Sequence, residues 1–74
     1  MLRKVHINGV TYRNEKGQRF PIPSQDCDLD EGVPKYGPTV KLLWKSENSQ
    51  NWQTTLTEKE LAHYVRIKAI KYLD

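Results

Sequence analysis

Residues 1–23 alternate between apolar and polar side chains in three short runs, which is typical of strands that bury one face. Asn8 and Gly9 separate the first two runs, and this dipeptide is the strongest short signal for a two-residue hairpin turn. Gly17 supplies the left-handed residue that a three-residue loop needs between the second and third runs. The pattern therefore predicts a three-stranded meander.

The two predicted turns determine which residues lie opposite one another. The first turn pairs Lys4 with Arg13, and the second pairs Arg13 with Arg19. Opposed like charges destabilise a strand pair by about 0.2–1 kcal/mol, so a row of three indicates a surface that binds an anion. His6 belongs to the same face and Lys16 to its margin. The apolar face of the meander would contain Val5, Ile7, Val10, Tyr12, Phe20 and Ile22.

Residues 39–56 show the same alternation in two further runs, separated by a polar connection at residues 46–50. They predict a β-hairpin with its tryptophans in the core, the usual place for an aromatic residue on an apolar strand face. The alternating positions are Val40, Leu42 and Trp44, followed by Trp52, Thr54 and Leu56.

The segment between these two parts, residues 24–38, contains two glycines, two prolines and four acidic residues. This composition is typical of a loop, and a loop of this length is often functional. We therefore predict a long acidic loop. Its candidate contacts with a protein partner are Asp28, Asp30, Glu31 and Tyr36.

Residues 57–74 begin with a capping box, in which Thr57 and Glu60 satisfy each other's free amides. A stripe at helical spacing follows, and it predicts one helix to the end of the chain. Because residues 65–69 also alternate, the alternative is a short helix that ends near Tyr64 and a final strand, as in a small SH3-like barrel. The stripe consists of Leu61, Val65, Ala69 and Tyr72.

Two isoleucines of the predicted long helix, Ile67 and Ile70, lie away from that stripe. Stray exposed aliphatic residues are ordinary in a small domain. Alternatively, the two form a ridge that contacts a protein partner or a second copy of the chain.

Together these patterns predict a small α+β fold in a single domain, residues 1–74, with an antiparallel sheet of about five strands and one C-terminal helix. The helix would cover the apolar face of the sheet.

The formal net charge of +3 is unevenly distributed. Residues 1–20 contain five basic side chains and one acidic side chain, whereas residues 21–38 contain four acidic side chains and one basic. Residues 39–74 contain six basic and four acidic side chains. The alternation indicates a local basic face rather than a uniformly cationic protein.

No apolar run approaches the roughly 20 residues of a membrane span, and the first residues do not resemble a signal peptide. One cysteine, Cys27, excludes an internal disulfide and fits a reducing compartment. We therefore expect a cytoplasmic protein without membrane contact.

Few side chains are arranged for catalysis or for metal binding. His6, His63 and Cys27 lack the spacing of metal ligands, and there is no glycine-rich phosphate loop. Asp26 and Asp28 flank Cys27, which should raise the thiol pKa and weaken it as a nucleophile. We therefore expect neither enzyme activity nor a cofactor or metal ion.

Binding remains as the predicted function. The preferred hypothesis is DNA or RNA binding, because cations on one sheet face can neutralise phosphates. Its candidate residues are Lys4, His6, Arg13, Lys16 and Arg19. The alternative is a protein-binding adaptor or inhibitor that uses the acidic loop and the ridge of Ile67 and Ile70.

Overall fold

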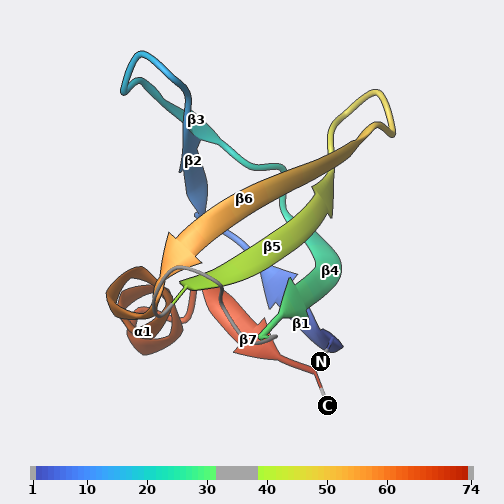
Figure 1. Ribbon diagram of the computed structural model, residues 1–74. Coiled ribbons are helices and arrows are strands. Elements are labelled where there is room, and N and C mark those ends of the chain that lie inside the picture. The colour runs from blue at the N-terminus through green and yellow to red at the C-terminus, as the bar shows by residue number, and fades with distance from the viewer. Residues whose placement is uncertain (1, 32–38, 74) are drawn as a thin grey trace.

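A computed structural model of the chain describes residues 2–31 and 39–73, and its largest element is a five-stranded antiparallel sheet (Figure 1). In spatial order its strands are β6 (Asn51–Thr57), β5 (Thr39–Lys45), β4 (Gln25–Asp30), β1 (Leu2–Ile7) and β7 (Ile70–Tyr72). A second sheet pairs β2 (Thr11–Arg13) with β3 (Arg19–Pro21), and helix α1 (Glu58–Arg66) joins β6 to β7. The predicted α+β class with a five-stranded antiparallel sheet is confirmed.

The core lies on one face of this sheet, and α1 and the segments that flank the β2–β3 hairpin complete it with Tyr64, Val10 and Ile22. Strands β1, β4 and β5 each contribute side chains from alternate positions, as half-buried strands do. The buried apolar residues are Val5, Ile7, Val10, Ile22, Cys27, Leu29, Val40, Leu42, Trp44, Leu56, Tyr64, Ala69 and Ile70.

The hairpin of β2 and β3 has the predicted register, with Arg13 opposite Arg19 and Tyr12 opposite Phe20. Gly17 has a φ of 82°, which the turn requires and which glycine adopts without a steric penalty. The Asn14 side-chain oxygen accepts hydrogen bonds from the backbone amides of residues 16 and 18, both at 2.9 Å. In Figure 1 the tip of this hairpin projects away from the main sheet.

The first predicted hairpin is wrong, because β1 pairs with β4 on one side and with β7 on the other, not with β2. A turn does occur at Gly9, whose φ is 92°, but the chain then leaves the plane of the main sheet. The backbone amide of Asn8 donates to the carbonyl of Ala69 at 2.8 Å. Strand β1 is therefore an interior strand of the sheet, paired on both sides with segments that are distant in sequence. Its Val5 and Ile7 side chains are fully buried.

The predicted loop at residues 24–38 is wrong for its first half, which forms strand β4. Cys27 and Leu29 point into the core, while Asp26, Asp28 and Asp30 occupy the opposite face. Acidic residues disfavour strands in general, but here basic side chains of β1 lie beside them. The remainder of the segment, residues 32–38, lies outside the described residues.

The hairpin at residues 39–56 is confirmed, with Trp44 opposite Trp52 and Val40 opposite Leu56. Its strands are paired without interruption from Thr39 to Lys45. The prediction that both tryptophans are core residues holds only for Trp44, because Trp52 lies in the edge strand and is 42% exposed.

Helix α1 begins at the predicted capping box: Thr57 Oγ1 accepts from the amide of Glu60, and Glu60 Oε1 accepts from the amide of Thr57, both at 3.1 Å. The predicted long helix is wrong, because the helix ends at Arg66 and Lys68 adopts a left-handed φ of 64°. Within the described residues, no helix is long and apolar enough to cross a membrane.

The short-helix alternative is closer to the structure, but its strand begins at Ile70, and the sheet does not close into an SH3-like barrel. The predicted ridge is also wrong. Ile70 is 1% exposed in the core, whereas Ile67 is 54% exposed. The turn at Lys68 separates these two side chains, so they do not share a helix face.

Candidate functional site

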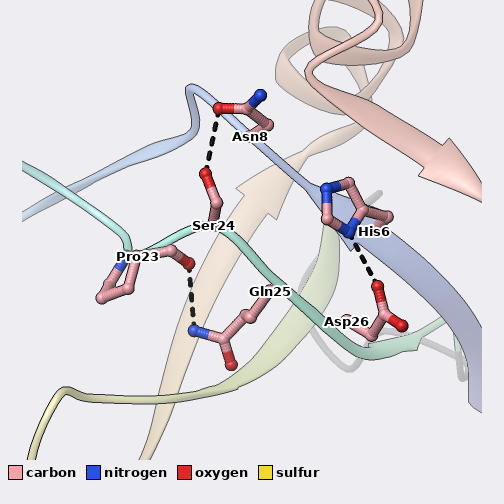
Figure 2. A network of polar contacts seen from close by, with 6 residues as sticks. All are labelled: His6, Asn8, Pro23, Ser24, Gln25 and Asp26. Carbon is pink, nitrogen blue, oxygen red and sulfur yellow. Dashed lines mark hydrogen bonds and ion pairs between the residues drawn. The ribbon is translucent and has the colours of Figure 1, made fainter.

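Two of the five predicted nucleic-acid contacts, Lys4 and His6, lie on the outer face of β1 beside the acidic face of β4. Lys4 Nζ is 3.0 Å from Asp28 Oδ1. His6 Nδ1 is 2.7 Å from Asp26 Oδ1, and Figure 2 shows this second pair. These acids balance the basic side chains beside them. The predicted row of Lys4, Arg13 and Arg19 is therefore wrong at Lys4, which pairs with β4 and not with the hairpin.

Two of the predicted protein-interface residues of the acidic segment lie in a strand and not in a loop. Asp28 and Asp30 are strand residues of β4, opposite β1. Glu31 accepts a hydrogen bond from the Tyr72 hydroxyl at 2.9 Å. Tyr36 lies outside the described residues.

The other three predicted cations remain together on the β2–β3 hairpin. Arg13 and Arg19 are direct neighbours across the two strands, and Lys16 lies exposed in the turn between them. Arg19 Nη1 donates to Thr11 Oγ1 at 3.2 Å, which holds its guanidinium beside the hairpin. In the part of the chain that the structure describes, no ion pair joins any of the three to an acidic side chain.

An aromatic cluster attaches this hairpin to the main sheet. The Tyr12 ring centre lies 5.3 Å from that of Trp44, 5.8 Å from that of Trp52 and 5.6 Å from that of Phe20. Trp44 is buried, and its indole Nε1 donates to Thr54 Oγ1 at 2.9 Å. Phe20 and Trp52 are 40% and 42% exposed. The cluster thus leaves the rings of Phe20 and Trp52 partly in solvent. Phe20 lies opposite Tyr12, on the hairpin face away from Arg13 and Arg19.

An open cleft of about 930 Å³ separates the hairpin from strand β6. Arg13, Arg19 and Trp52 border it, together with the threonines of β6. Two acids also border it, but Glu60 is engaged in the capping box and Glu15 lies in the hairpin turn. The sequence pattern predicts Arg13 and Arg19 as binding residues. It does not predict that Trp52 is exposed, because that depends on the position of β6 at the edge of the sheet.

A second hollow, of about 610 Å³, opens where β4 and β5 diverge. Gln25 bridges the gap: its amide nitrogen donates to the carbonyl of Lys45 at 2.8 Å, and its oxygen accepts from the amide of Lys45 at 2.9 Å. The same nitrogen contacts the carbonyl of Pro23, as Figure 2 shows. The divergence of β4 and β5 accounts for this hollow, so we do not assign it a binding role.

Cys27 borders the second hollow and is not an activated nucleophile. Burial, together with the carboxylates of Asp28 and Asp26, raises the pKa of its thiol to about 11. The predicted direction of the pKa shift is confirmed. At neutral pH the thiol is protonated, and a protonated thiol is a poor nucleophile.

Among residues 2–31 and 39–73, no group of three or more histidine, cysteine or acidic side chains is placed to hold a metal ion. Comparisons with protein-family models, with curated proteins and with solved structures gave no match. The candidate site is therefore defined by its geometry: Arg13, Arg19 and the half-exposed ring of Trp52 border the cleft beside β6, and Lys16 and Phe20 lie elsewhere on the same hairpin.

Proposed function

We propose that this protein binds single-stranded nucleic acid, without catalysis, through the β2–β3 hairpin. Arg13, Lys16 and Arg19 contact phosphates, and bases stack on the exposed rings of Phe20 and Trp52. The observation that carries the proposal is that Arg13 and Arg19, which make no described ion pair, border the same cleft as the half-exposed ring of Trp52.

Charge is the first support. The outer face of the main sheet places acids beside its bases, whereas the hairpin carries three basic side chains and one acid, Glu15. Arg13 and Arg19 repel each other in the free protein, and a phosphate between them relieves that repulsion. Phosphate neutralisation supplies most of the affinity of non-specific nucleic-acid binding.

The aromatic rings favour single strands over duplexes. Stacking of a base on an aromatic side chain contributes about 1–3 kcal/mol and requires bases that are not already stacked in a helix. No described element of the hairpin resembles a recognition helix that enters the major groove, and α1 presents its first turn to the cleft. We therefore expect a preference for unpaired oligonucleotides.

The test is a fluorescence anisotropy titration of a labelled oligothymidylate and a matched duplex at low salt. Three phosphate contacts predict a slope of about −2 in a plot of log affinity against log salt concentration. The double variant Arg13→Gln/Arg19→Gln should lose most of the affinity. The matched control Lys41→Gln/Lys45→Gln removes the same charge from the main sheet and should retain it.

Two results would overturn the proposal. One is the absence of binding to either probe at low salt. The other is an equal loss of affinity in both double variants, which would reduce the effect to net charge. A Trp52→Leu variant that binds as tightly as the native chain would refute base stacking at that ring.

A further inference from the structure

Helix α1 carries a stripe of basic side chains in solvent. Lys59, His63 and Arg66 are spaced at positions i, i+4 and i+7, so they lie on one face of the helix. All three are exposed. In the part of the chain that the structure describes, none of them forms an ion pair with an acidic side chain. None of the three is among the contacts predicted from the sequence.

A small hollow joins the start of this basic stripe to the β2–β3 hairpin. It has a volume of about 360 Å³, and Arg19 of β3 borders it together with Lys59, Glu60, His63 and Tyr64 of α1. Arg19 also borders the larger cleft beside β6. The two hollows are therefore neighbours, with the Arg19 side chain at the border of both.

Contacts to Tyr64 position the basic side chains on both sides of the small hollow's sequence elements. Arg19 Nη1 donates to Thr11 Oγ1 at 3.2 Å, and Thr11 Oγ1 lies 3.4 Å from the Tyr64 hydroxyl. The His63 ring centre is 5.7 Å from that of Tyr64. Tyr64 itself belongs to the buried core. The hairpin and α1 thus present their cations from one connected framework.

The hollow has an excess of groups that can bind an anion. Glu60 is the one acidic residue among those that border it, and its Oε1 accepts from the amide of Thr57 at 3.1 Å. Arg19 and Lys59 each carry a positive charge beside it, and His63 offers an N–H donor in either protonation state. A phosphate group, with its charge and several acceptor oxygens, matches these donors.

We infer that the single-stranded nucleic acid continues from the cleft past Arg19 and along the basic stripe of α1, where Lys59, His63 and Arg66 contact further phosphates. The inference rests on the proposed function, because it extends the binding surface of the hairpin. A row of cations on one helix face suits a polymer that carries a charge on every unit.

Fluorescence anisotropy with two labelled oligothymidylates tests the inference. Their lengths lie at the two ends of the range of about 4–16 nucleotides that single-strand binding sites occupy. The short probe should occupy the cleft, where Trp52 offers a ring for stacking, and the long probe should also reach α1. The native chain should therefore show a salt slope of about −2 with the short probe and about −3.5 with the long probe, since Lys59 and Arg66 each add about 0.7.

The double variant Lys59→Gln/Arg66→Gln should return the slope with the long probe to about −2 and leave the affinity for the short probe unchanged. Glutamine suits a helix as well as lysine and arginine do, so circular dichroism and the unfolding transition should match those of the native chain. The matched control Lys41→Gln/Lys45→Gln removes the same charge from the main sheet and should keep the steeper slope.

The two probes separate failure of this inference from failure of the proposed function. Equal long-probe slopes for the native chain and Lys59→Gln/Arg66→Gln, with short-probe binding intact, would overturn the inference alone. An equal reduction of the slope in Lys41→Gln/Lys45→Gln would overturn it as well, because the effect would then be one of net charge. A native chain that binds neither probe at low salt would refute the proposed function and the inference together.

Discussion

At the scale of single residues, the side chain of Gln25 takes the place of a peptide group. Strands β4 and β5 pair directly only at residues 28–30 and 41–43, so the backbone groups of Lys45 have no strand partner in β4. The Gln25 amide offers one donor and one acceptor with the geometry of a peptide bond and satisfies both groups, at 2.8 and 2.9 Å. One side chain thereby maintains the sheet where the two strands diverge.

Replacement of Gln25 by alanine should lower the free energy of unfolding by about 1–3 kcal/mol, because it leaves two backbone groups of Lys45 without a protein partner. Chemical denaturation measures the change. The control is Gln53→Ala, an exposed side chain on the outer face of β6, which should cost no more than about 0.5 kcal/mol. Equal effects of the two substitutions would contradict the bridging role of Gln25.

Cys27 provides a pH-dependent prediction at the same scale. Burial and the carboxylates of Asp28 and Asp26 raise the thiol pKa from 9.0 to about 11 in the folded chain. The folded state therefore holds the proton more tightly than the unfolded state. Stability from this group is complete below pH 9 and is lost as the pH rises through 11.

The expected loss is about 1–2 kcal/mol between these pH values, from a shift of about two pKa units in a partly solvated site. Other groups titrate in the same range, so the measurement is the difference between the native chain and Cys27→Ala. The stability of the native chain relative to Cys27→Ala should decrease as the pH rises from 9 to 11. In addition, iodoacetamide should modify the native thiol at pH 8 much more slowly than the thiol of the denatured chain. A pH-independent difference would show that the thiol pKa is ordinary.

At the scale of elements, local signals were predictable and distant pairings were not. The capping box of Thr57 and Glu60 and the turn at Gly17 depend on residues within a few positions, and both are confirmed. The end of α1 depends on Ala69 and Ile70, which become buried when β7 pairs with β1. No pattern within residues 65–73 distinguishes that outcome from a longer helix.

The candidate binding residues show the same contrast between local signals and distant strand pairings. Arg13, Lys16 and Arg19 were found together because one local hairpin positions them. Lys4 and His6 were misplaced because the signal at Asn8 and Gly9 predicts a turn but not which strand becomes the partner of β1. Only the assembled sheet places acidic side chains beside them.

The turn after α1 places Ile67 in solvent and Ile70 in the core, so we expect substitutions at these two positions to have different effects on stability. Ile70→Ser should destabilise the chain by about 2–4 kcal/mol, because Ile70 is 1% exposed and its removal leaves a cavity containing a hydroxyl. Ile67→Ser should cost no more than about 0.5 kcal/mol, since Ile67 is 54% exposed. Chemical denaturation of both variants decides the matter. An equal loss of unfolding free energy in the two variants would indicate that Ile67 is also buried, and would contradict the helix end at Arg66.

At the scale of the whole molecule, the sheet arranges its charges in alternating rows. The acidic face of β4 lies between the basic side chains of β1 and those of β5, with Lys4 opposite Asp28 and Lys41 opposite Asp30. A face of this kind has little net charge. Much of the excess of +3 is therefore concentrated elsewhere, and the β2–β3 hairpin is one such place.

This distribution predicts different roles for two basic residues that the sequence placed side by side. Arg13→Gln should reduce the magnitude of the salt slope for oligothymidylate binding by about 0.7, the contribution of one phosphate contact. Lys4→Gln should leave the slope unchanged, because Asp28, 3.0 Å from the Lys4 amine, keeps that region close to neutral. Anisotropy titrations at several salt concentrations measure both slopes. If Lys4→Gln reduced the slope by that amount and Arg13→Gln left it unchanged, the nucleic acid would lie across the main sheet, and the hairpin would not be the binding surface.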